Sequence, residues 1–301
     1  MLRKFIAVLF MAIAVNATAA TQRAPQPPVR MLVQTDWLAT HLSDRNLVIL
    51  HVGANRAAYD AGHIPGARFV ALNEIAVTRN GIPYELPPAN DLKTIFERLG
   101  VGDHSNVVLY GDAFGLFAAR AYFTLDYLGH GNSVALLDGG LEKWSKEHGV
   151  TRTPPGNIAP AVLTVHPRPA LVVEMPAVKR AVYSRSIALI DARSPMDYSG
   201  ANGGRRSGHI PGAKNVFWQE NLVSQGNPVL KPATEIRARY ASLGIKPGAE
   251  VIVYCQSGIQ AAYDYFTLEL TGFRPVLYDA SFAEWGNDFS APIETGNGGR
   301  P

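Results

Sequence analysis

Short apolar runs alternate with longer segments of mixed polarity along most of this chain. The clearest runs are residues 47–50, 107–110, 188–190 and 251–254. Uninterrupted hydrophobic runs of this length are typical of strands buried on both faces of a parallel sheet. Between the runs, Ile236, Tyr240 and Leu243 recur at helical spacing, and the glycine that follows them fits the end of a helix. The pattern therefore predicts an α/β fold, with parallel strands flanked by helices.

The same pattern occurs twice along the chain. Gly-His-Ile-Pro-Gly-Ala at 62–67 returns at 208–213, and Tyr-Phe-Thr-Leu at 122–125 returns at 265–268. Matching positions lie between 141 and 146 residues apart throughout. A nearly constant offset of domain length indicates two tandem copies of one domain.

The domain boundaries follow from this repeat. We place the copies at about residues 29–150 and 171–295, and the proline-rich segment 151–170 between them reads as a linker. A chain of 301 residues has room for two domains of ordinary size.

Residues 1–20 have the features of a signal peptide. Arg3 and Lys4 precede an apolar run over 5–15 that is too short to span a bilayer, and 17–19 read Ala-Thr-Ala, as signal peptidase requires. A retained N-terminal anchor is the alternative. We therefore expect a periplasmic or secreted protein with no membrane contact after cleavage.

Composition restricts the partners. Hydrophobic residues make up 47% and charged residues 18%, as in a globular protein, and the net charge is +3 without any polybasic run. Nucleic acid and anionic membranes are therefore not expected partners. No cluster of cysteine and histidine has the spacing of metal ligands, so we expect neither a metal nor an organic cofactor.

The sequence contains one cysteine, Cys255, which follows the predicted strand 251–254 directly. Residues 255–260, the cysteine loop, read Cys-Gln-Ser-Gly-Ile-Gln, and a helix is expected to open at Ala261. A thiol between a strand end and a helix N-terminus should have a lowered pKa, because free amides and the helix dipole favour its anion. Gly258 would let these amides turn inward. A buried, inert cysteine is the alternative.

The first copy provides an internal comparison. At the matching place it reads Tyr-Gly-Asp-Ala-Phe-Gly over 110–115, with no cysteine and one more residue in the loop. Chemistry should therefore be confined to the second copy, with the first copy closing the cleft.

The doubled motif, the Tyr-Cys-x-Ser-Gly loop in the second copy alone, and the paired Trp144 and Trp285 resemble the two-domain rhodanese family. This family comprises thiosulfate and 3-mercaptopyruvate sulfurtransferases, and the resemblance covers roughly residues 30–290. It implies two tandem rhodanese-like domains in which Cys255 carries sulfur as a persulfide. It also implies that Arg193, just after the first strand of the second domain, binds the anionic donor. The resemblance assigns substrate contacts in the loop to Gln256, Ser257, Gly258, Ile259 and Gln260.

The loop also bears on the choice of donor. Thiosulfate enzymes of this family typically have Cys-Arg-Lys-Gly, and mercaptopyruvate enzymes typically have Cys-Gly-Ser-Gly. This chain has neither cation but keeps Ser257, which could polarise the substrate or cap the helix.

Mercaptopyruvate enzymes also pair the serine with a histidine and an aspartate of the first domain. His63 matches that histidine, but His51 stands where the aspartate is expected, and His209 in the second copy favours a shared fold role for His63. Thiosulfate and 3-mercaptopyruvate both remain open as donors.

Other readings of Cys255 also remain. A cysteine-dependent phosphatase would need an arginine six positions after the cysteine, where this chain has Ala261. A sulfur-relay carrier or an inert sensing module would use the same thiol. The resemblance favours an enzyme that takes sulfur from a small anionic donor and passes it to cyanide, a thiol or a thioredoxin-like protein.

Overall fold

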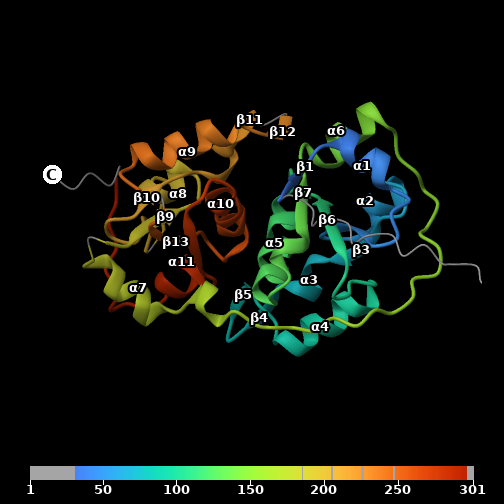
Figure 1. Cartoon of the computed structure of the whole chain (residues 1–301). Helices are drawn as coiled ribbons and strands as arrows, with labels where there is room; N and C mark the ends of the chain where they lie inside the picture. Colours follow the sequence, from blue (N-terminus) through green and yellow to red (C-terminus); the bar gives the residue numbers. More distant parts are fainter. Residues whose placement is uncertain (1–30, 185, 205, 225–226, 247, 297–301) are drawn as a thin grey trace, which may run out of the picture.

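Two α/β domains lie side by side in the computed structural model of the chain (Figure 1). The structure describes residues 31–184, 186–204, 206–224, 227–246 and 248–296, so the expected signal peptide lies outside the described residues. Each domain holds a five-stranded parallel sheet with helices around it. The predicted α/β fold with two tandem domains is therefore confirmed.

The first domain carries the sheet order β1-β7-β6-β2-β3 and a small antiparallel hairpin, β4–β5. Its elements are β1 (Leu32–Val33), α1 (Thr35–His41), β2 (Leu47–Gly53), α2 (Arg56–Ala61), β3 (Arg68–Ala71), α3 (Leu72–Ile75), β4 (Val77–Arg79), β5 (Ile82–Glu85), α4 (Ala89–Arg98), β6 (Asn106–Gly111), α5 (Leu116–Tyr127), β7 (Val134–Leu137) and α6 (Gly140–Glu147).

The second domain has the same arrangement, with the sheet order β8-β14-β13-β9-β10 and the hairpin β11–β12. Its elements are β8 (Val172–Val173), α7 (Met175–Val182), β9 (Ala188–Asp191), α8 (Pro195–Ser199), β10 (Lys214–Asn215), β11 (Leu222–Ser224), β12 (Asn227–Leu230), α9 (Ala233–Ser242), β13 (Glu250–Tyr254), α10 (Ile259–Leu270), β14 (Arg274–Tyr278) and α11 (Ser281–Trp285).

Helices cover both faces of each sheet, so the central strands are buried. Their sequences are accordingly almost wholly apolar. The paired tryptophans occupy equivalent positions in the two domains. Trp144 and Trp285 are buried, and their indole N–H groups donate to the carbonyl oxygens of Gly149 at 2.6 Å and Pro292 at 2.8 Å. Among the described helices, none is long and apolar enough to cross a membrane.

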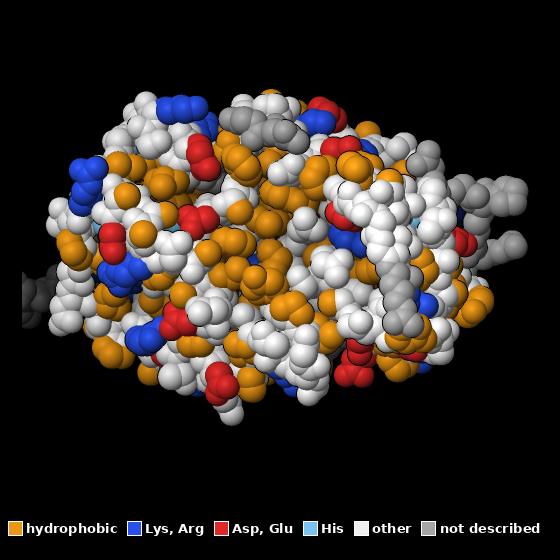
Figure 2. All heavy atoms as spheres, turned by 180° about the vertical axis from the view of Figure 1, so that it is seen from behind, with side chains coloured by type: hydrophobic (Ala, Val, Ile, Leu, Met, Phe, Trp, Pro, Cys, Tyr) orange, Lys and Arg blue, Asp and Glu red, His pale blue; other side chains and the backbone are white. Residues whose placement is uncertain are grey.

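The domains meet along α5 and α10, the helices that follow the two matching loops. Nearly every residue of both helices is buried, because each lies between its own sheet and the other helix. Tyr122 and Phe266 meet edge to face with ring centres 5.0 Å apart, and so do Phe123 and Tyr265 at 4.9 Å. Seen from behind, hydrophobic side chains gather along the middle of the molecule, where the halves join (Figure 2).

A polar cluster lies within this interface. Tyr122 donates to Glu269 at 3.1 Å, while Tyr265 donates to Asp126 at 2.6 Å, and Arg168 pairs with Asp126 at 2.5 Å. Burial raises the pKa of Glu269 to about 7, helped by the nearby charge of Asp126. The interface therefore holds a carboxyl group that titrates close to neutral pH.

We predict that Glu269→Gln changes the pH dependence of stability. The pKa of Glu269 is higher in the folded protein than its ordinary value of 4.5, so the native state holds this proton more tightly than the unfolded chain. Its contribution to stability is therefore full below about pH 4.5 and is lost as pH rises through about 7. We define ΔTm as the Tm of Glu269→Gln minus the Tm of wild type. This difference should be about 4 °C larger at pH 8.5 than at pH 5.

The control is Glu235→Gln, which removes a carboxylate from the exposed side chain of an i,i+4 pair with Lys231. Its Tm should follow wild type at both pH values. Parallel Tm curves for wild type and Glu269→Gln would contradict the prediction.

Candidate active site

Cys255 lies at the carboxyl end of β13, the strand between β9 and β14. The helix α10 begins at Ile259, two residues before the expected start, with Gly258 as its N-cap at φ +80°. That left-handed conformation favours glycine and tightens the turn. Cys255 is only 1% exposed. The topology thus brings the thiol to a helix N-terminus at the sheet edge where parallel α/β proteins bind ligands.

Two opposing effects act on the thiol. Burial raises the pKa of Cys255 most strongly, while backbone hydrogen bonds from Ala261, Ser257 and Gln260 lower it. The charge of Asp191 raises it further. The net shift is upward, so the expected lowering of the thiol pKa is wrong for the resting protein, because desolvation of the thiolate outweighs the loop amides.

A cavity of about 230 Å³ opens at Cys255 between the two domains. From the second domain it is lined by Cys255 itself and by Gln256, Ser257, Ile259 and Gln260, whereas Gly258 does not line it. The first domain supplies the opposite wall through Leu72 of α3, Tyr84 of β5 and Phe117 of α5. The cavity is therefore small, and the domain without a cysteine contributes an apolar and aromatic wall to it.

Ser257 lies in this wall, but it does not cap the helix. The N-cap is Gly258, and it makes no side-chain cap hydrogen bond. The capping role considered for Ser257 is therefore wrong, because the helix begins at Ile259 and the residue directly before it is Gly258. Its hydroxyl remains a candidate contact for a donor in the cavity.

Arg193 is buried beside Asp191. Its Nε lies 3.0 Å and 3.2 Å from the two carboxylate oxygens, and its Nη2 donates to Asp191 at 2.6 Å and to the carbonyl oxygen of Gly208 at 2.7 Å. The guanidinium carbon also lies 4.0 Å from the centre of the Phe282 ring. Most of its donor capacity is therefore used within the protein.

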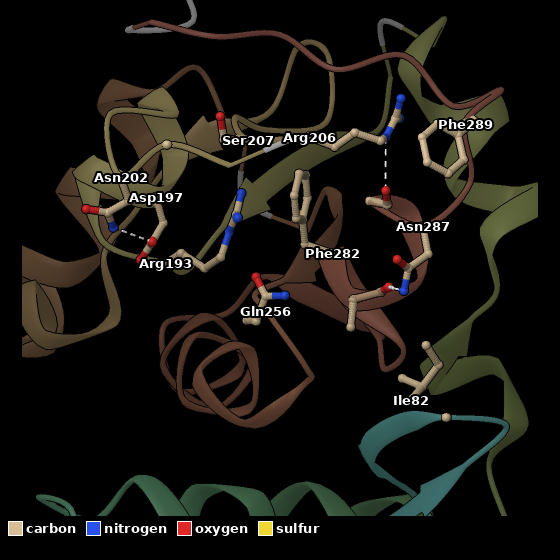
Figure 3. Close-up of a pocket in the computed structure, with 14 residues that line it drawn as sticks. Ile82, Arg193, Asp197, Asn202, Arg206, Ser207, Gln256, Phe282, Asn287 and Phe289 are labelled. Carbon is tan, nitrogen blue, oxygen red and sulfur yellow. Dashed lines mark hydrogen bonds between the residues drawn. The ribbon is translucent and has the colours of Figure 1, made fainter.

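Arg193 nevertheless borders a second pocket, of about 540 Å³ (Figure 3). This pocket also contains Arg206, which donates to the carbonyl oxygens of Gly286 and Asp288, and it shares Gln256 with the cavity at Cys255. Burial lowers the pKa of Arg193, but the hydrogen bonds and charge of Asp191 raise it more, and the charge of a Cys255 thiolate adds to the increase. Two cations thus line a pocket that adjoins the cavity at Gln256, and sequence reasoning did not single out Arg206.

The histidines of the repeated motif have equivalent places in the two domains. His63 Nδ1 lies 2.9 Å from the carbonyl oxygen of Tyr59, and His209 Nδ1 lies 2.7 Å from that of Tyr198. His63 also stacks on the ring of Tyr59, with ring centres 3.9 Å apart, and His209 stacks on the ring of Tyr198, with ring centres 3.8 Å apart. Neither histidine lines the cavity at Cys255. This symmetry favours a fold role for His63 over a catalytic one.

His51 is buried in the first domain and lies 3.0 Å from Asp112. Asp112 belongs to the loop that matches the cysteine loop, and its other oxygen accepts the N–H of Ala54. Burial lowers the pKa of His51 most strongly, against the opposing effect of Asp112. The structure therefore places His51 beside the matching loop of the first domain, and it does not line the cavity at Cys255.

Three residues that sequence reasoning missed surround the cysteine loop. The hydroxyl of Ser281 accepts the N–H groups of Cys255 and Gly258, both at 3.1 Å. Two positions earlier, Asp279 pairs with Arg120 of the first domain at 2.5 Å. The repeat contained a signal for Asp279, because Asp138 occupies the same place in the first copy. Nothing local marked the contact with Arg120, which lies 159 positions away in sequence.

Three potential metal ligands, Asp36, Glu147 and His148, lie within 4.8 Å of one another on the surface of the first domain. All three are exposed, and none lines the cavity at Cys255. The geometry at Cys255 itself, a thiol surrounded by amides, fits nucleophilic sulfur chemistry.

Comparison with known proteins agrees with this geometry. A family model described as the rhodanese-like domain matches residues 34–147 and 175–288. The sulfur carrier protein TtuD of Thermus thermophilus is 34% identical over 287 residues, covering 88% of this chain and 97% of its own. A probable 3-mercaptopyruvate sulfurtransferase of Pseudomonas aeruginosa is 32% identical (88% and 98%), and a thiosulfate sulfurtransferase of Corynebacterium glutamicum is 31% identical (88% and 90%).

Solved structures show the same fold. The anaerobic ergothioneine biosynthesis enzyme of Chlorobium limicola, in complex with trimethyl histidine, is 25% identical with a TM-score of 0.78, covering 88% of this chain and 70% of that one. A variant of EanB with a cysteine persulfide, in a tetrahedral intermediate state with ergothioneine, is 26% identical with a TM-score of 0.77 and the same coverage. Because the family model matches both halves and named sulfurtransferases align over most of their length, the chain belongs to the rhodanese family and is one of its two-domain sulfurtransferases.

Proposed function

We propose that this sulfurtransferase moves sulfane sulfur from thiosulfate or 3-mercaptopyruvate to a thiophilic acceptor through a persulfide on Cys255. One observation carries the proposal: the only cysteine in the sequence lines a cavity between the domains while three loop amides hydrogen-bond to its sulfur. The related EanB variant that carries a cysteine persulfide supports this chemistry.

In the first step, the Cys255 thiolate attacks the outer sulfur of the donor. The bond that joins this sulfur to the rest of the donor breaks, and its electron pair leaves with sulfite, or with the enolate that takes up a proton to become pyruvate. The negative charge then resides on the terminal sulfur of the persulfide. Amides that face this position stabilise the charge without having to reorient.

In the second step, a nucleophilic acceptor attacks the terminal sulfur. The persulfide S–S bond breaks and the electron pair returns to Cys255, which becomes a thiolate again. Cyanide would leave as thiocyanate, whereas a thiol or a thioredoxin-like protein would leave as a persulfide. The two steps are separate, so we expect ping-pong kinetics.

Both donors remain candidates. The cysteine loop has no cation and keeps Ser257 in the cavity wall, which favours 3-mercaptopyruvate. The nearby pocket contains Arg193 and Arg206, which could hold the anionic end of either donor. A carrier role in a sulfur relay is the second candidate, because one relative bears the name of a sulfur carrier protein.

We predict that Cys255→Ser reduces sulfur transfer to cyanide by at least about a thousandfold, because a hydroxyl does not form a persulfide. The measurement is thiocyanate release by the mature protein, with thiosulfate and 3-mercaptopyruvate tested side by side. Circular dichroism of the variant provides the control for folding. Substantial transfer by Cys255→Ser would contradict the mechanism, and no turnover by folded, reduced wild type with either donor would favour the carrier role.

Arg193→Ala should raise the donor KM about tenfold, because it removes a cation beside the cysteine loop. The same change leaves Asp191 buried without its partner, so it also lowers Tm. The double variant Asp191→Asn/Arg193→Gln separates the two effects, because it leaves no unpaired charge. A raised KM in the double variant would support donor binding by Arg193, and a wild-type KM would make the arginine structural.

We also propose that the chain is exported, to the periplasm or outside the cell, with cleavage after residue 19 or 20. The support is the charged, apolar and small-residue pattern of residues 1–20. N-terminal sequencing of the protein from fractionated cells should find a mature chain that begins at residue 20 or 21. An intact N-terminus on a cytoplasmic protein would refute the proposal.

A further inference from the structure

The cysteine loop is held from outside by the segment between β14 and α11. Besides the two hydrogen bonds to the Ser281 hydroxyl, the N–H of Phe282 donates to the carbonyl oxygen of Cys255 at 3.0 Å, and that of Ala283 to Gln256 at 2.9 Å. Four hydrogen bonds thus connect residues 281–283 to the loop that carries the sulfur. This segment therefore holds the backbone of the loop at Cys255, Gln256 and Gly258, next to the amides that act on the thiol.

Ser281 occupies a strained backbone conformation. Its φ is +56°, in the left-handed region that a side chain disfavours, and it is completely buried. The matching residue of the first copy, 141 positions earlier, is Gly140, with a φ of +54°. The second copy therefore has a serine where the fold favours glycine, and its hydroxyl accepts the two loop amides.

The same segment is held by a charge from the first domain. Arg120, on α5, is fully buried, and its Nη1 and Nη2 lie 2.5 Å and 3.3 Å from the two oxygens of Asp279. The N–H of Leu86 also donates to Asp279, at 2.7 Å. A Cβ on Gly258 would lie 2.6 Å from Asp279 Oδ1 and 3.1 Å from Arg120 Nη1, so this ion pair is packed directly against the cysteine loop.

Arg120 also reaches the wall of the cavity. Its Nη2 donates to the carbonyl oxygen of Tyr84 at 2.8 Å. Tyr84 has a φ of +62°, which is unfavourable for a tyrosine, and it lines the cavity opposite Cys255. One guanidinium therefore connects both sides of the cavity.

The repeat shows what is specific to the catalytic side. Asp138 matches Asp279, and it accepts the N–H of Leu230 at 2.9 Å, just as Asp279 accepts that of Leu86. The residue that matches Arg120, however, is Tyr263, 143 positions later. Each half thus has an aspartate that accepts a backbone N–H from the other domain. Only the aspartate near the cysteine loop, Asp279, is also paired with an arginine.

We propose that Arg120, a residue of the domain without a cysteine, is a positioning residue for sulfur transfer. Through Asp279 it holds the segment that presents the Ser281 hydroxyl to the cysteine loop, and through Tyr84 it holds the opposite wall of the cavity. The inference rests on the proposed role of Cys255. It gives the first domain, which carries no cysteine, a part in the reaction.

The test compares Arg120→Met with Asp138→Asn, which perturbs the matching interdomain contact on the other side. Two quantities are measured: the pH profile of Cys255 alkylation by iodoacetamide, and the single-turnover rate of persulfide formation with the better donor. The alkylation profile reports on the thiol, which is affected by Asp191 and by the amides of Ser257, Gln260 and Ala261. It requires no sulfur transfer, so it remains informative if the persulfide proposal fails.

Arg120→Met should slow persulfide formation between about ten- and a hundredfold and shift the alkylation profile to higher pH, because displaced amides stabilise the thiolate less. Asp138→Asn should leave both quantities at wild-type values, even if it lowers Tm. Arg120→Lys should recover only part of the rate, because a single nitrogen does not bridge Asp279 and Tyr84 in the same way.

Ser281→Gly keeps the test decisive if Arg120→Met does not fold. Glycine accepts the left-handed conformation, so this change removes the hydroxymethyl side chain without straining the backbone. It should shift the alkylation profile in the same direction as the arginine variants. A wild-type profile and rate in Ser281→Gly and Arg120→Lys, or equal defects in Asp138→Asn, would overturn the inference.

Discussion

The ion pair between Arg120 and Asp279 is the contact on which the arrangement of the site depends. Both side chains are almost completely removed from water, and they come from different domains. Removing one partner of a buried pair commonly costs about 3–5 kcal/mol, because the remaining charge stays desolvated. The two domains therefore do not separate without exposing a charge and the apolar faces of α5 and α10. The cavity at Cys255 has a defined shape because its two walls are joined at this point.

The two halves show how a symmetric repeat acquires one reactive site. Both sheets have the same strand order, both loops precede a helix with a left-handed glycine at its N-cap, and an aspartate of each half receives an amide from the other. Three sequence differences between the copies lie at the site. The loop of the second copy contains Cys255, whereas that of the first copy has no cysteine. Arg120 of the first copy matches Tyr263, and Ser281 stands in place of Gly140. These differences converge on one loop.

Two opposing effects act on the pKa of the Cys255 thiol. Burial disfavours the thiolate, while three amides favour it, and in the resting protein burial dominates. A fully accessible low-pKa thiol would be exposed to oxidation. Cys255 is only 1% exposed, so the thiol is shielded from most of the solvent and is reached from the cavity that it lines. In the proposed mechanism the same amides would also favour the anion of a persulfide on Cys255.

The sequence by itself determined the fold class, the tandem repeat, the family resemblance and the candidate nucleophile. These follow from local signals, because apolar runs, a repeated motif and a lone cysteine after a strand are readable without three-dimensional contacts. It placed Arg193 near the site but did not show its pairing with Asp191, and it led to the wrong direction for the Cys255 pKa. That direction depends on burial, which arises only when both domains pack around the loop.

Only the tertiary structure decided which residues hold the site together. Arg120 and Asp279 are 159 positions apart, and each looks ordinary in its own segment. The conformation of Ser281 likewise depends on the turn in which it sits. Contacts of this kind form where two independently patterned domains meet, and their partners have no fixed spacing along the chain. The sequence therefore specified the candidate nucleophile, and the packing of the two domains specified its surroundings.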